Sequence, residues 1–91
     1  MTVTIKIPAV WKPFVGGTSH VHCNATTVCD ALCELIKQFP QLTSQLFNDK
    51  QEVNETLILF VNQEHIRFRG GLSAPLSDGD EIYIVPMITG G

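Results

Sequence analysis

A single amphipathic helix, expected between residues 28 and 39, constrains the fold of this chain more than any other feature. Apolar side chains recur there at intervals that place them on one helical face. Thr27 precedes them as an N-cap with Asp30 three residues later, and Pro40 ends the helix because the residue before proline avoids helical angles. The apolar residues are Val28, Leu32, Leu35, Ile36 and Phe39. Such a face must be buried against another layer of structure.

The segments around this helix have the alternation typical of strands. Residues 2–7 alternate polar and apolar side chains, and Gly16-Gly17 predicts a turn into a second strand at residues 19–23. Residues 56–62 and 81–85 are also strand-like, and Pro86 should end the pairing. The side chains expected to point to the core from the last two strands are Leu57, Leu59, Val61, Ile82 and Ile84.

The order hairpin, helix, strand, strand predicts an α+β fold of the β-grasp, ubiquitin-like type. Its mixed sheet should have four to five strands, with the one main helix packed on one face. Residues 42–47 predict a short second helix or turn, and residues 48–55 a polar loop. We expect residues 1–86 to form one domain and residues 87–91 a flexible tail.

Composition excludes several classes of function. The chain has 91 residues and a net charge of −3, with no basic stripe for binding nucleic acid. It has no apolar run of the ~20 residues that span a bilayer, and its first residues do not resemble a secretion signal. Three cysteines at these spacings fit neither a disulfide framework nor a zinc site, so we expect a reduced, cytoplasmic protein.

The chain ends in the segment Met87-Ile88-Thr89-Gly90-Gly91, directly after the last predicted strand. Two glycines without side chains can enter a narrow channel in a partner enzyme, and five extended residues reach at most roughly 17 Å. Activation by ATP would turn the terminal carboxylate into an acyl-adenylate that a sulfur nucleophile can attack. A chance Gly-Gly end, expected in about one chain in 200, is the alternative.

Several motifs resemble the sulfur-carrier family that includes the molybdopterin synthase small subunit and the thiamine-pathway carrier. They are residues 60–63 (FVNQ), residues 76–82 (LSDGDEI), Val85-Pro86 and the terminal Gly90-Gly91. The insert at residues 64–72, with its Arg-Phe-x-Gly-Gly-Leu segment, is similar to the branch of cysteine-biosynthesis carriers and their siderophore and homocysteine relatives. The resemblance covers essentially the whole chain.

The resemblance implies a carrier that is not an enzyme and holds no cofactor. An ATP-dependent, E1-like enzyme would adenylate Gly91, and sulfide or a persulfide would convert it to a thiocarboxylate. The implied acceptor is a biosynthetic enzyme such as a PLP-dependent sulfhydrylase, followed in the cysteine branch by a JAMM-type zinc peptidase. The alternatives are a molybdopterin synthase small subunit, which the insert disfavours, a ubiquitin-like modifier of lysines, and a non-reactive binding module. Met87, Ile88 and Thr89 are bulkier than the small run common in relatives, so the activating enzyme must accommodate them.

Four apolar residues alternate opposite to the core set on the last two long strands. They are Ile58, Phe60, Tyr83 and Val85. An apolar face beside the base of the tail is where a partner should dock, and Arg67 and Phe68 are candidates for the same surface. The competing explanation is that the chain's own residues 8–17, Trp11 and Phe14 in particular, cover this face. Arg67 and Arg69 each have two equally supported interpretations. Each could pair with an acidic residue of a partner, or each could be an ordinary solvated charge.

The cysteines and histidines give weaker signals. Cys29 and Cys33 lie four residues apart on one side of the helix, and we expect them to be buried small hydrophobes instead of a redox or metal pair. His20 and His22 share a strand face without the third or fourth ligand that zinc requires, and His65 is distant in sequence, so no metal site is predicted.

Overall fold

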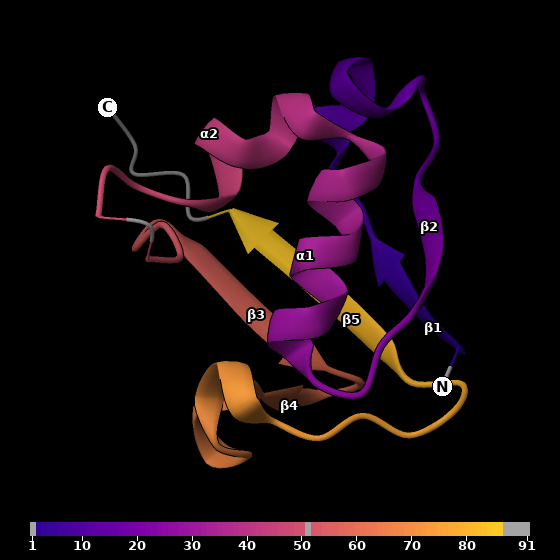
Figure 1. Ribbon diagram of the computed structural model, residues 1–91, viewed down its shortest axis with the longest axis vertical. Coiled ribbons are helices and arrows are strands. Elements are labelled where there is room, and N and C mark those ends of the chain that lie inside the picture. Colours follow the sequence, from indigo (N-terminus) through magenta and orange to yellow (C-terminus); the bar gives the residue numbers. More distant parts are fainter. Residues whose placement is uncertain (1, 51, 87–91) are drawn as a thin grey trace.

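The computed structural model describes residues 2–50 and 52–86, and Figure 1 shows their arrangement. The strands are β1 (Thr2–Lys6), β2 (His20–Asn24), β3 (Leu57–Val61), β4 (Glu64–His65) and β5 (Glu81–Pro86). The α-helices are α1 (Val28–Gln38) and α2 (Thr43–Leu46). Four 3-10 helices connect these elements: η1 (Ala9–Val15), η2 (Pro40–Leu42), η3 (Ile66–Phe68) and η4 (Gly71–Ser73).

The five strands form one mixed sheet in the order β2-β1-β5-β3-β4, with α1 across one face (Figure 1). Strands β1 and β5 lie in the centre and run parallel, whereas the other neighbours are antiparallel. This is the β-grasp layout that the sequence predicts.

The core lies between the sheet and α1, where apolar residues of both layers meet. Val3 and Ile5 of β1 are fully buried, as are Val28 and Leu35 of α1. The core-facing residues predicted for β3 and β5 are confirmed, since all are buried except Leu57, which is half-buried against the core.

Local signals define the ends of α1. The Thr27 side chain accepts a hydrogen bond from the Asp30 amide at 3.2 Å, which satisfies one of the free donors of the first turn. The helix stops at Gln38, and Phe39 leaves the helical region before Pro40. The predicted N-cap and terminating proline are therefore confirmed.

The segment between the first two strands contributes two buried side chains, Trp11 and Val15, to the core. It forms η1, which packs near η2, and its Trp11 is 3% exposed within the core cluster. Phe14 remains 37% exposed. The competing explanation, in which Trp11 covers the outer face, is therefore not supported, because the indole is buried in the core cluster.

Two further features differ from expectation. The short strand β4 and the two 3-10 helices after it are not apparent from sequence periodicity, because each is only two or three residues long. Cys29 and Cys33 are exposed, not buried, since both lie at the edge of the apolar stripe of α1. Among the described residues, no helix combines the length and apolar character needed to cross a membrane.

Candidate functional site

The register of β3 and β5 brings four apolar side chains together on the face of the sheet opposite α1. Ile58 lies opposite Val85, and Phe60 lies opposite Tyr83. Because side chains alternate along a strand, these residues point away from the core that their neighbours fill. Val85 is 42% exposed and the other three are half-buried.

Strand β4 and η3 extend this surface toward the edge of the sheet. His65 pairs with Phe60, and their ring centroids are 5.6 Å apart in an edge-to-face arrangement. Phe68, which is 72% exposed, lies 6.3 Å from the His65 ring. The Arg67 guanidinium lies over the Phe68 ring at 5.6 Å. We call Ile58, Phe60, Phe68, Tyr83 and Val85 the apolar outer face, with Arg67 at its rim.

The predicted partner residues therefore share one surface, and His65 connects its two parts. Sequence periodicity alone does not place His65 on this surface. A signal was available, since a tight turn after residue 61 would place position 65 opposite Phe60.

A polar network holds Tyr83 in place at the other margin of the apolar outer face. The Tyr83 hydroxyl donates to Glu81 Oε1 at 2.9 Å, and Lys6 Nζ lies 3.3 Å from Glu81 Oε2. Lys6 Nζ also lies 5.9 Å from the centroid of the Tyr83 ring. Donation from Tyr83, and then from Lys6, lowers the pKa of the Glu81 carboxyl below its ordinary value of 4.5. The same bond raises the pKa of Tyr83, because the carboxylate favours the protonated phenol.

Asn62 and Asp80 join the two motifs that carry the family resemblance. Asn62 has a φ of 56°, a left-handed conformation that asparagine tolerates better than most residues. Its side chain donates to Asp80 Oδ1 at 3.2 Å and accepts from the Glu81 amide at 3.1 Å. Asp80 also accepts from the Ser77 amide at 2.9 Å. These motif residues fix the start of β5 against the end of β3, so their role in the fold is structural.

The two arginines beside Phe68 have different surroundings. Arg69 is tied to its own domain, with Nη1 3.3 Å from Glu64 Oε1 and Nη2 donating to the Pro75 carbonyl at 3.4 Å. Arg67 is exposed and contacts Phe68. Only Arg67 of this pair presents its charge to the solvent in a way that suits a partner.

The chain leaves the sheet at the end of the apolar outer face. Pro86, the last described residue, pairs with Leu57, and Val85 immediately before it belongs to the face. The predicted reactive segment, Met87, Ile88, Thr89, Gly90 and Gly91, lies outside the described residues. What the structure defines is the point where this segment begins.

Neither the histidines nor the acidic residues form a metal centre in the described part of the chain. His20 and His22 are engaged with β1, where Lys6 Nζ lies 2.7 Å from His20 Nε2 and Thr4 Oγ1 3.1 Å from His22 Nδ1. Within residues 2–50 and 52–86, no three side chains of His, Cys, Asp or Glu are grouped closely enough to hold a metal ion.

Comparisons with known proteins agree with this geometry. The chain is 29% identical to the sulfur carrier protein CysO of Mycobacterium tuberculosis, with both chains covered in full. A chain of the crystal structure of the Amycolatopsis orientalis BexX/CysO complex superposes with a TM-score of 0.88 at 29% identity, over 98% of this chain and 99% of that one. The small archaeal modifier protein 1 (SAMP1) of Methanosarcina acetivorans superposes with a TM-score of 0.84 at 29% identity, over 99% and 96%. The model of the ThiS family matches residues 5–91, and the chain belongs to that family.

Proposed function

We propose that Gly91 is the reactive group of this ThiS-family sulfur carrier and that its carboxylate is converted to a thiocarboxylate. The observation that carries the proposal is the family match, which extends from the first strand through the terminal Gly91. Full-length similarity to a sulfur carrier protein of M. tuberculosis supports the same chemistry.

The reaction takes place on the backbone of the last residue, in the active site of a partner enzyme. A carboxylate oxygen of Gly91 attacks the α-phosphorus of ATP and pyrophosphate leaves, which gives an acyl-adenylate. Sulfide then attacks the acyl carbon and AMP leaves, which gives the thiocarboxylate directly. Where a persulfide of the partner enzyme is the nucleophile, the product is an acyl disulfide, and a second thiol of that enzyme cleaves its sulfur–sulfur bond to release the thiocarboxylate and form an enzyme disulfide. The domain contributes rigidity and recognition, while glycine at the last two positions keeps the tail narrow. The protein is therefore a co-substrate, not a catalyst.

We infer that the E1-like activating enzyme docks on the apolar outer face. An exposed apolar patch with aromatic residues and an arginine at its rim has the composition of an interface core. Val85 lies one residue before Pro86. The active site of an enzyme bound there can therefore lie up to roughly 17 Å from Pro86, the distance that five extended residues span. The same enzyme would then contact the apolar outer face and the reactive end in one complex.

Later partners are the acceptors of the sulfur. A PLP-dependent sulfhydrylase and a JAMM-type zinc peptidase follow from the similarity to cysteine-biosynthesis carriers. The Amycolatopsis relative was crystallised in a complex with BexX, which supports recognition of this fold by a partner protein. The three cysteines are free thiols in this fold, which suits a reducing compartment such as the cytoplasm.

Intact-mass spectrometry tests the reaction. The chain is incubated with its activating enzyme, ATP and sulfide, and we expect the mass gain of one oxygen replaced by one sulfur. A variant with one alanine added after Gly91 keeps both glycines but moves the carboxylate, and it should show no gain. An unchanged mass for the natural chain with an enzyme that forms its adenylate would overturn the proposal.

A second function, modification of lysines, is favoured by the similarity to SAMP1, a small archaeal modifier protein. A lysine amine would then attack the acyl carbon of the same adenylate. AMP would leave, and an isopeptide bond would form between Gly91 and the lysine. Peptide mapping of proteins captured with the chain would reveal Gly-Gly remnants on lysines. Their absence under conditions that produce the thiocarboxylate would exclude this role.

A further inference from the structure

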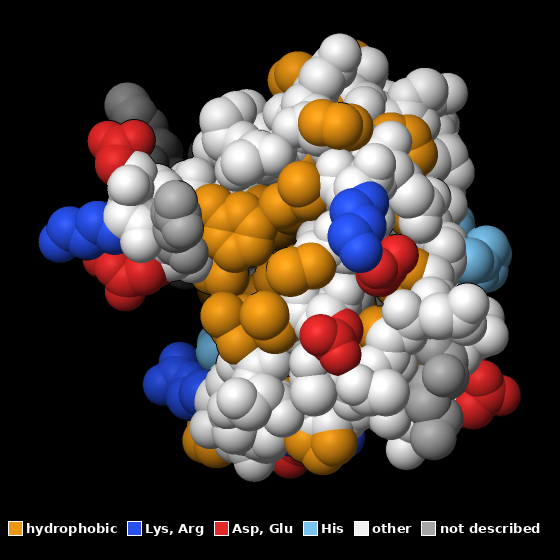
Figure 2. All heavy atoms as spheres, in the orientation of Figure 1, with side chains coloured by type: hydrophobic (Ala, Val, Ile, Leu, Met, Phe, Trp, Pro, Cys, Tyr) orange, Lys and Arg blue, Asp and Glu red, His pale blue; other side chains and the backbone are white. Residues whose placement is uncertain are grey.

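A second apolar surface lies on the helical side of the molecule. An open groove of about 970 Å³ runs beside α1, and Figure 2 shows hydrophobic side chains gathered in a hollow on this side. Apolar side chains from three elements line it, with Ile36 from α1, Phe47 after α2 and Leu72 from η4. This groove is separate from the apolar outer face, which lies across the sheet.

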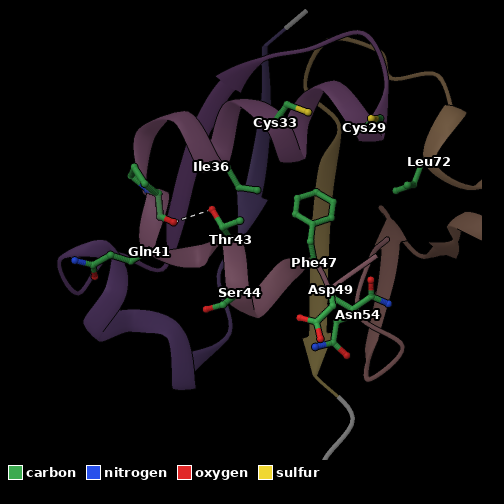
Figure 3. Close-up of a pocket in the computed structure, with 12 residues that line it drawn as sticks. Cys29, Cys33, Ile36, Gln41, Thr43, Ser44, Phe47, Asp49, Asn54 and Leu72 are labelled. Atoms are coloured by element: carbon green, nitrogen blue, oxygen red, sulfur yellow. Dashed lines mark hydrogen bonds between the residues drawn. The ribbon is translucent and has the colours of Figure 1, made fainter. Parts of the chain in front are cut away.

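Cys29 and Cys33 stand together at the rim of this groove. Both are exposed free thiols, four residues apart on α1 (Figure 3). Residues at that spacing are neighbours on a helix, with Cβ atoms about 5–6 Å apart. Burial, and then the neighbouring Cys29, raise the pKa of the Cys33 thiol.

The spacing disfavours a disulfide bond between these two residues. A disulfide needs Cβ atoms about 3.5–4.5 Å apart, closer than an intact helix places them. A linear sulfur–metal–sulfur unit, with bonds of about 2.3 Å as in zinc thiolates, spans about 4.6 Å. Two side chains on adjacent turns can therefore reach one bridging ion without distortion of the helix.

The neighbouring carboxylates are engaged elsewhere. Asp30 Oδ2 accepts from Thr26 Oγ1 at 2.8 Å, and Glu34 Oε1 is paired with Lys37 Nζ at 3.1 Å. Zinc prefers four ligands and would lack half of them, since the described residues offer no third member for a metal cluster here. Soft thiolate ligands with low coordination favour monovalent copper over zinc or hard cations.

We propose that Cys29 and Cys33 form a two-coordinate site for a soft monovalent cation, namely Cu(I). Each thiol loses its proton as a sulfur–copper bond forms, so two protons are released and no oxidation state changes. The apolar groove on one side of the pair limits access of water to the bound ion. This site is independent of the proposed reaction at Gly91.

Competition for Cu(I) tests the site. The reduced full-length chain, with an unmodified terminal carboxylate, is titrated without oxygen against a chromophoric Cu(I) chelator. We expect one Cu(I) per chain. Cys29→Ser and Cys33→Ser should each lower the affinity for Cu(I) by more than about 100-fold. Loss of a group that only hydrogen-bonds to a metal ligand typically costs less than this. Cys23→Ser is the matched control, because this thiol is only 8% exposed and lies on β2.

Two results would overturn the site. One is a Cys29→Ser, Cys33→Ser double variant that competes for Cu(I) as well as the natural chain. The other is an equal loss of affinity in Cys23→Ser, which would place the ion elsewhere. Circular dichroism of each variant establishes that the helix is intact, and X-ray absorption of the copper complex should show two sulfur neighbours.

Discussion

The outer face of the sheet has two halves of opposite character. On the β2–β1 half, polar side chains are paired across the strands, as in Thr4 with His22 and Lys6 with His20. On the β5–β3–β4 half, the residues that face each other are apolar, and Val85 is 42% exposed. The halves meet where Lys6 and Tyr83 share Glu81.

The difference shows how one sheet separates stability from recognition. Polar side chains on the first half have hydrogen-bond partners within the fold. They are stable when exposed to solvent and need no partner protein to cover them. Burial of the exposed aromatic and aliphatic groups on the second half lowers the free energy, so these groups favour contact with a partner that covers them. The chain leaves the sheet from this second half, at Pro86, and this is the half that we expect an activating enzyme to cover.

The largest expected effect concerns stability and contrasts the core with the apolar outer face. Leu35→Ala removes a fully buried side chain, and the resulting cavity should lower the free energy of unfolding by about 2–5 kcal/mol. Ile58→Ala, on the half-buried outer face, should lower it by only about 1 kcal/mol. Urea denaturation measures both, and equal losses would mean that the outer face belongs to the folding core.

The next effect concerns the interaction with the activating enzyme. Phe60→Asp places a charge in the centre of the apolar outer face, and burial of that charge should reduce kcat/KM for adenylation by about 30-fold or more. Thr4→Asp, on the polar half, is the matched control and should change it by less than about threefold. Activity retained by Phe60→Asp, with its fold intact, would contradict docking on this half.

A smaller effect is expected from two exposed valines at different places. Val85→Ser should weaken activation by up to about tenfold, because an interface that covers the side chain contributes roughly 1.5 kcal/mol. Val10→Ser in η1, where Val10 is 62% exposed, should leave the rate unchanged. The ratio of the two kcat/KM values is the measurement, and a ratio near one would remove Val85 from the contact.

The smallest effect is on the pH dependence of stability at the boundary between the halves. The pKa of Glu81 is lowered in the folded state, so the folded protein binds fewer protons there than the unfolded chain. The stabilisation is present above the ordinary value of 4.5 and is lost as the pH falls below it toward the folded-state pKa. Tyr83→Phe removes the main cause and should flatten the pH profile of the melting temperature in that acidic range. An identical profile would show that the bond does not control Glu81.

Long periodic segments of the sequence predicted most of the fold. The stripe from Val28 to Phe39, its cap at Thr27 and the alternation around Leu59 and Ile82 all agree with the structure, because burial on one face dictates each pattern. Strand β4 was not identified, since two residues cannot establish a period. Cys29 and Cys33 were misplaced because a position at the edge of the stripe can be on either side of the burial boundary.

The candidate site was predictable only in part, for physical reasons. Alternation placed Ile58, Phe60, Tyr83 and Val85 on one face, but it could not say what covers that face. That question depends on where Trp11 packs, a long-range contact that no local pattern encodes. The link through His65 depends on the turn after β3, and the network of Glu81 depends on the pairing of β5 with β1.

Mapping the enzyme contact by NMR on the isotopically labelled chain tests the central claim most directly. In a complex with the activating enzyme, cross-saturation should be strongest at Ile58, Phe60, Phe68 and Val85 and weak at Thr4 and His22. Saturation centred instead on the polar half, or on the groove beside α1, would contradict the assignment of the apolar outer face as the docking surface.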